Sequence, residues 1–148
     1  MTMEENLRNF MQDYHNVLNS KKYEGLAEFL VFPFEIALKG TTLRLNTLDE
    51  AIEAFQAVDQ VHDLRGVAYV LQNVYLVHAT SLSEAIIGTD ETAYDAAGNE
   101  LVNWHSSYLM NRINSIWRLT HANAINYDEA WENRGALVLH AAAESSLC

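Results

Sequence analysis

The second half of the chain alternates apolar and polar residues with a period of two over four long segments. This alternation predicts β-strands over residues 67–79, 83–95, 100–113 and 115–125. Two of the linkers, "DAAGNE" and "RINS", are short and rich in turn-forming residues. Short connections between long strands predict an antiparallel meander, which restricts the fold more than any other feature of the chain.

Helical spacing of apolar residues dominates the first part of the chain. Capping boxes are expected at Thr2–Glu5 and at Thr47–Glu50, where each begins an apolar stripe. We expect helices over residues 2–19, 20–30 and 47–58, and a hairpin of two short strands over residues 34–40 and 41–46. Helices followed by strands indicate the α+β class. Three N-terminal helices on the concave side of a strongly curved antiparallel sheet would form a cone-shaped α+β barrel, whose open mouth suits a small molecule.

Composition excludes several classes of partner. The chain has 148 residues, enough for one domain, and a formal net charge of −11 with no basic stripe. Such a charge disfavours nucleic acid and anionic membrane as partners. The N-terminal segment "MTMEENLRNF" lacks the features of a signal peptide, so we expect a cytoplasmic protein.

Metal and cofactor chemistry is not indicated by the sequence. The only cysteine is the last residue, Cys148, and the six histidines show neither HxH nor HExxH spacing. No glycine-rich phosphate loop and no GxSxG motif occurs. We therefore expect no metal site, no bound cofactor and no hydrolase triad.

Three local motifs resemble one known superfamily. "YHNVLNSKKYEGL" resembles the first helix and turn of ketosteroid isomerase, "SIWRLTHANA" the final strand of SnoaL-like polyketide cyclases, and "EAIIGTD" a strand of scytalone dehydratase. These proteins belong to the nuclear transport factor 2-like superfamily, which the chain resembles over roughly residues 4–126. The resemblance implies a cone-shaped, cystatin-like fold over residues 1–126, a homodimer, and a C-terminal extension, 127–148, of unknown structure.

The resemblance also implies site residues. Tyr14 falls where ketosteroid isomerase keeps its oxyanion-hole tyrosine, but no carboxylate stands near Leu38, where that enzyme has its base. Asp90 falls where scytalone dehydratase has a histidine, and Tyr69 where many relatives have another. The familiar histidine pair of these relatives is therefore replaced by Tyr69 and Asp90.

Strand alternation sorts the remaining candidates. Trp104, Tyr108 and their neighbours on the same face suit the apolar cone, which places His105 outside. Trp117 and Leu119 share a face with His121, which is expected either near the mouth of the cone or in a contact between the two copies of a dimer. Asp90 is either a buried general base or a solvated charge, because Glu91 competes with it for the inward position. The expected ligand-binding side chains are Tyr69, Trp104, Ser106, Tyr108, Met110, Trp117 and Asn123.

Two functions fit these residues. The first is a cofactor-independent isomerase, dehydratase or cyclase that abstracts a proton next to the carbonyl of a small, apolar substrate. Asp90 would be the base, Tyr14 or Tyr69 would hold the oxyanion, and His121 would relay a proton. The second is a non-catalytic ligand-binding or dimeric assembly module on the same fold.

Overall fold

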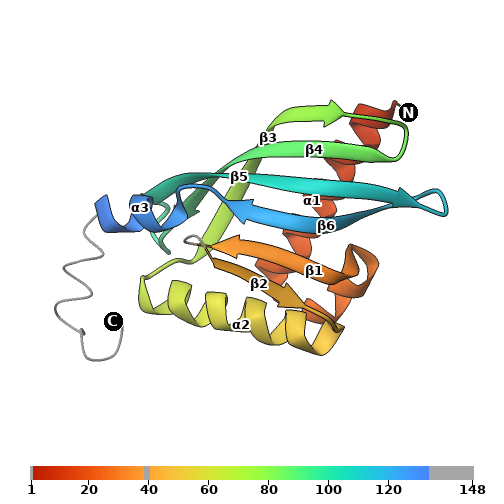
Figure 1. The fold of residues 1–148 in the computed structure, drawn as a ribbon. Helices are drawn as coiled ribbons and strands as arrows, with labels where there is room; N and C mark the ends of the chain where they lie inside the picture. Colours follow the sequence, from red (N-terminus) through yellow and green to blue (C-terminus); the bar gives the residue numbers. More distant parts are fainter. Residues whose placement is uncertain (1, 39–40, 134–148) are drawn as a thin grey trace.

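The computed structural model describes residues 2–38 and 41–133, and shows two long helices packed on one strongly curved sheet (Figure 1). The elements in chain order are α1 (Met3–Ser20), the 3-10 helix η1 (Tyr23–Glu28), β1 (Leu30–Leu38), β2 (Thr41–Leu45), α2 (Leu48–Leu64), β3 (Tyr69–Ala79), β4 (Glu84–Tyr94), β5 (Glu100–Ile113), β6 (Ile116–Ala124) and α3 (Tyr127–Trp131). The predicted α+β class is confirmed, and the second predicted helix is the short 3-10 turn η1.

The six strands form one sheet in the order β2-β1-β6-β5-β4-β3. The meander predicted for the second half of the chain is confirmed, because β3, β4, β5 and β6 pair antiparallel in sequence. The predicted hairpin is β1 with β2. One pairing differs from the all-antiparallel expectation: β1 runs parallel to β6. The chain crosses through α2 to the far edge of the sheet and then returns strand by strand until β6 meets β1.

The helix starts follow the predicted capping chemistry in most details. At α1, Thr2 Oγ1 accepts from the Glu5 amide at 3.1 Å, and a Glu5 carboxylate oxygen accepts from the Thr2 amide at 3.0 Å. At α2, Thr47 Oγ1 accepts from the Glu50 amide at 3.2 Å. The Glu50 carboxylate bonds the Asn46 amide at 2.9 Å instead of that of Thr47, so the second box is only half formed. α2 also continues past the predicted end at residue 58 to Leu64.

β-bulges bend the sheet. Tyr75 is an extra residue in β3, between Val74 and Leu76, and Thr120 is an extra residue in β6. An extra residue increases the local twist and reverses the inside-outside alternation beyond it. The bulge at Thr120 therefore decides which residues of β6 face the helices.

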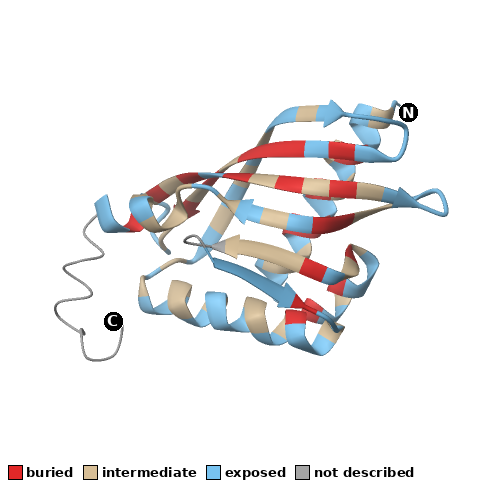
Figure 2. Ribbon diagram, viewed as in Figure 1, coloured by how far each residue is buried: buried red, intermediate tan, exposed pale blue. Residues whose placement is uncertain are grey.

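Two groups of buried side chains form the core, and both alternate with exposed positions along the strands (Figure 2). The larger joins α1 and η1 to the sheet and includes Leu7, Met11, Phe34 and Leu119. The smaller lies at the other end of β5, where Trp104 packs near Trp131 of α3. The first residues of the predicted extension thus pack onto the sheet as α3. Residues 134–148, with Cys148, lie outside the described part of the chain.

Candidate active site

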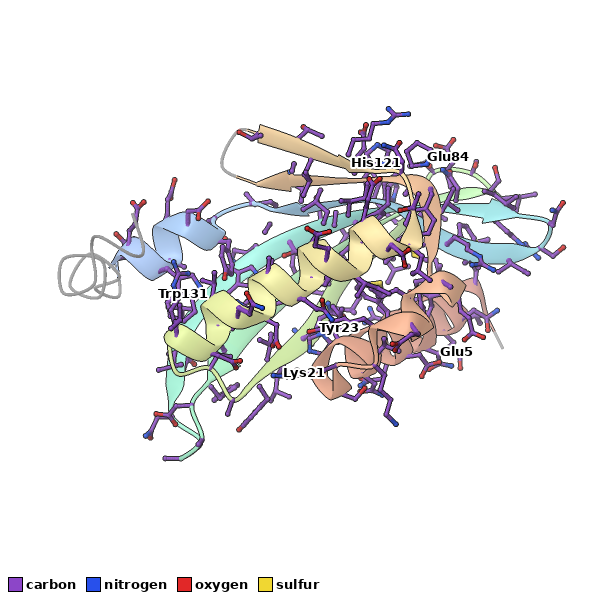
Figure 3. All side chains as sticks on the ribbon, turned by 90° about the horizontal axis from the view of Figure 1, so that it is seen from below. Glu5, Lys21, Tyr23, Glu84, His121 and Trp131 are labelled. Atoms are coloured by element: carbon purple, nitrogen blue, oxygen red, sulfur yellow. The ribbon has the colours of Figure 1, made fainter. Side chains whose placement is uncertain are left out.

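A cavity of about 430 Å³ lies between α1, α2 and the concave face of the sheet. Most of its wall is apolar, with Leu18, Ile36, Phe55 and Val58 among the lining side chains. Polar groups from different elements are part of its wall, and they include Tyr14 of α1, Glu91 of β4, Ser106 and Tyr108 of β5, His62 and Asp59 of α2 and Tyr127 at the start of α3. Figure 3 shows the molecule from the side of α2, which crosses in front of the sheet. The cavity combines an apolar body with a few placed polar groups, as small-molecule sites do.

Glu91 is the buried carboxylate of this cavity. Its side chain is held by three donors that converge on one oxygen, and the residue is only 7 % exposed. Thr89 Oγ1 and the Tyr108 hydroxyl each donate to Oε2 at 2.8 Å, and Gln72 Nε2 donates at 3.3 Å. Within residues 2–38 and 41–133 nothing donates to Oε1. Three donors on one oxygen fix the orientation of the carboxylate and leave the second oxygen without a donor in the described part of the chain.

Tyr14 and Tyr108 stand beside this carboxylate as neutral phenols. Tyr14 is 1 % exposed, and its ring meets that of Tyr108 edge to face at 6.2 Å. Burial, reinforced by the negative charge of Glu91, raises the pKa of both hydroxyls far above the ordinary value for tyrosine. The Tyr14 hydroxyl has no hydrogen-bond partner in the described part of the chain. It is therefore a protonated donor at the cavity wall, where the resemblance implied one.

Asp90 lies on the opposite face of β4, which corrects the expectation that it shares the cavity with Tyr14. Its side chain is 39 % exposed, and its Oδ1 accepts from Asn103 Nδ2 at 2.6 Å and lies 3.8 Å from His105 Nδ1. The inward residues of β4 are Ala85, Ile87, Thr89, Glu91 and Ala93. Two adjacent carboxylates give the same pattern in either register, so the sequence could not choose between them.

His121 also lies outside the cavity, and the bulge at Thr120 is the reason. Leu119 points into the core, but the extra residue reverses the alternation, so Ala122 and Ala124 line the cavity instead. The His121 side chain is 50 % exposed and its Nε2 lies 3.1 Å from Glu35 Oε1. The prediction that His121 relays a proton in the cavity is therefore wrong, because its side chain lies on the outer face of the sheet. Asn123 is exposed and reaches only the rim.

The other predicted ligand-binding residues divide into three groups. Trp104, Ser106 and Tyr108 line the cavity, as the alternation of β5 predicts, and His105 points outward. Met110 is fully buried in the core and Trp117 borders a separate groove beside α1, so neither is at the cavity wall. Tyr69 lies at the rim, partly exposed, with its ring stacked on Tyr94 at 5.2 Å.

A cluster at the contact between α2 and α3 was missed by sequence reasoning. His62 Nε2 lies 2.6 Å from the Tyr127 hydroxyl, and both side chains line the cavity. Burial, with the positive charge of Arg65, lowers the pKa of His62 to about 4, so its ring is neutral. The neutral Nε2 then accepts a hydrogen bond from the Tyr127 hydroxyl. The apolar stripe of the second predicted helix ended before His62, and the tail had no clear pattern, so no local signal joined the two.

Two classes of feature are absent from the described residues. Within residues 2–38 and 41–133, no group of histidine, cysteine, aspartate or glutamate side chains could hold a metal ion. No helix in the same ranges has the length and apolar character needed to cross a membrane.

Solved structures with the same arrangement of elements are numerous. A domain of unknown function with a cystatin-like fold from Nostoc punctiforme superposes with a TM-score of 0.67, at 18 % identity, over 99 % of this chain and 100 % of that one. The chain has the nuclear transport factor 2-like fold. A nuclear transport factor 2-like protein of unknown function from Shewanella oneidensis gives a TM-score of 0.66 at 10 % identity, over 83 % of this chain and 98 % of that one.

A ketosteroid isomerase-like protein from Erwinia carotovora gives a TM-score of 0.59 at 15 % identity, over 78 % of this chain and 89 % of that one. No family model matches the chain. No curated protein matches it either. Likeness at this level of identity concerns the nuclear transport factor 2-like fold alone, so function is argued from the cavity.

Proposed function

We propose that the cavity binds a small, largely apolar molecule with a carbonyl group, and that the protein abstracts a proton from the carbon next to that carbonyl. The observation that carries the proposal is Glu91, a buried carboxylate with one oxygen held by three donors and the other unbonded within residues 2–38 and 41–133. The reaction would be a cofactor-independent isomerisation, dehydration or cyclisation. Glu91 takes the role that the sequence pointed to at Asp90.

The proposed step uses two groups. Glu91 Oε1 takes the proton, and the electron pair of the broken C–H bond forms the C=C bond of an enolate as the carbonyl oxygen gains charge. The Tyr14 hydroxyl donates a hydrogen bond to that oxygen. The protonated Glu91 then returns the proton to a different carbon, or to a departing hydroxyl, which regenerates the free carboxylate. Tyr108, Thr89 and Gln72 keep Oε2 in place throughout.

Proton abstraction can be measured without knowing the natural substrate. The protein is incubated in D₂O with 1-tetralone or 1-indanone, and the loss of the protons next to the carbonyl is followed by NMR. We expect wild-type protein to accelerate exchange, Glu91→Gln to reduce the rate by about 100-fold or more, and Tyr14→Phe by about 10- to 100-fold. Thermal unfolding with and without the ketone reports binding separately.

Asp90→Asn is the matched control, because it removes the same charge from the adjacent position of β4 on the outer face. Its exchange rate should equal that of wild type. A loss of exchange in Asp90→Asn as large as in Glu91→Gln would contradict the assignment of the base. Ketone binding with no exchange above background would refute the catalytic step and leave the non-catalytic ligand-binding module as the function.

A further inference from the structure

The contact with Tyr127 holds the neutral ring of His62 in one tautomer. Burial raises the pKa of the Tyr127 hydroxyl to about 12, so this group keeps its proton. Side-chain N–H groups of Arg65 and Trp131 donate toward the Tyr127 oxygen, which directs the hydroxyl proton to His62 Nε2, 2.6 Å away. A nitrogen that accepts a hydrogen bond carries no proton, so the single proton of the neutral imidazole is on Nδ1.

This Nδ1–H group of His62 has no acceptor in the protein. Within residues 2–38 and 41–133 nothing bonds to it, and it is not among the enclosed unbonded atoms of those ranges, so it faces accessible space. His62 lines the cavity. Its ring is packed among those of Trp104, Tyr127 and Trp131, whose centroids lie 6.3, 5.9 and 6.3 Å away. A donor held in place at a cavity wall is suited to bind an acceptor of a ligand.

The position of His62 along the cavity differs from that of Glu91. The His62 ring lies next to Trp104, whereas Tyr108, four residues further along β5, donates to Glu91 at 2.8 Å. Trp104 and Tyr108 both line the cavity, and four residues of a strand span roughly 13 Å. The cavity therefore has two polar ends, with a largely apolar wall between them.

We propose that the ligand is elongated and carries a second oxygen, which accepts a hydrogen bond from His62 Nδ1–H while the reacting carbonyl lies at Glu91 and Tyr14. The inference rests on the proposed function, because it adds a second recognition point in the same cavity. A hydrocarbon group at this end would displace water from the N–H group without replacing its hydrogen bond, which weakens binding. Glu91 and Asp59 in the same wall disfavour an anion, so we expect a neutral oxygen, such as that of a ketone or an ether.

Two ketones of the same shape test the second oxygen. In 4-(4-acetylphenyl)cyclohexan-1-one a carbonyl oxygen takes the place of one methyl group of 4-(4-isopropylphenyl)cyclohexan-1-one, at the end remote from the ring ketone. Calorimetric titration gives the dissociation constant of each, and comparison of their ratio between protein variants cancels the general difference in hydrophobicity.

We expect His62→Phe to shift this ratio by about tenfold against the acetyl compound, because the ring stays and the donor is lost. His62→Gln should shift the ratio by about threefold or less, since an amide can accept from the Tyr127 hydroxyl and also donate to the ligand. His78→Phe, which removes an exposed histidine of β3 that does not line the cavity, is the matched control and should leave the ratio unchanged.

NMR of wild-type protein tests the donor without changing the fold. Long-range ¹H–¹⁵N spectra distinguish the Nδ1–H tautomer from the Nε2–H tautomer, and the signals of His62 are those lost in His62→Gln. We expect the Nδ1–H tautomer. The Nε2–H tautomer, or an equal ratio of dissociation constants in wild type, His62→Phe and His78→Phe, would overturn the second recognition point and leave the proposed function standing. Failure of both ketones to bind would instead remove the ligand-binding premise of the proposed function, and this inference with it.

Discussion

Gly88 shows how a single missing side chain permits the curvature beside the cavity. It lies on the outer face of β4, opposite the bulge in β3, where Tyr75 crosses over it. A Cβ at this position would lie 3.0 Å from Tyr75 Cζ and 3.1 Å from Leu76 Cβ. The Tyr75 ring is 54 % exposed and has room to turn away, but the Leu76 Cβ is fixed by the backbone.

We expect Gly88→Ala to lower the free energy of unfolding by about 1–2 kcal/mol, because β3 must shift away from β4. Urea denaturation of the single variants and of Gly88→Ala/Tyr75→Ala measures the coupling. Removal of the Tyr75 ring should recover only part of the loss, since the contact with Leu76 remains. Unchanged stability of the single Gly88→Ala variant would show that the outer face is not tightly packed at this point.

The contact between α2 and α3 depends on a neutral histidine. His62 Nε2 accepts a hydrogen bond from the Tyr127 hydroxyl, and the pKa of His62 falls from the ordinary 6.5 to about 4. In the unfolded chain the same ring takes up a proton near pH 6.5. Between pH 6.5 and pH 4, His62 therefore takes up a proton when the chain unfolds. The free energy of unfolding must then fall as the pH decreases through this window.

We expect wild-type protein to lose about 2 kcal/mol of unfolding free energy between pH 7 and pH 5 through His62 alone. The side chain of His62→Gln can still accept a hydrogen bond from the Tyr127 hydroxyl, but it does not titrate. Between pH 7 and pH 5 the unfolding free energy of this variant should therefore fall by about 2 kcal/mol less than that of wild type. Chemical denaturation at each pH gives the two curves. Parallel curves for the two proteins would show that His62 is not held neutral at this contact.

At the scale of the whole molecule, the outer sheet face carries several apolar side chains. Leu71, Tyr75 and Leu76 of β3 and Ile86 of β4 are exposed there, along an edge strand that has no partner on one side in the described part of the chain. Exposed apolar groups on an open sheet edge favour association. The homodimer implied by the resemblance stays a prediction.

Light scattering at several protein concentrations tests this prediction. We expect a mass of twice 16.8 kDa for wild type, and a shift toward the monomer for Leu71→Glu, because a charge in an apolar contact between copies is not compensated. Thr42→Glu, which adds a charge at an exposed position of β2 on the opposite edge of the sheet, is the control and should keep the mass of wild type. A monomer at all concentrations would exclude the dimer.

Several features of this protein were determined by its sequence alone. The α+β class, the order of the elements, the meander and the inward face of Trp104, Ser106 and Tyr108 all follow from periodicity, capping residues and turns, which are local signals. Local signals also predict that the last strand begins with an apolar face. Such local signals do not predict contacts between separate elements.

Only the tertiary structure determines which side chains come together at the cavity. The parallel pairing of β1 with β6, the bulge at Thr120, the choice of Glu91 over Asp90 and the contact of Arg65 with Trp131 all depend on which residues meet across the sheet or across the cavity. A shift of one residue exchanges the two faces of a strand, and the sequence of a single strand is compatible with both registers. The inward carboxylate could therefore be narrowed to two neighbouring residues by sequence, and it is identified as Glu91 only by the folded sheet.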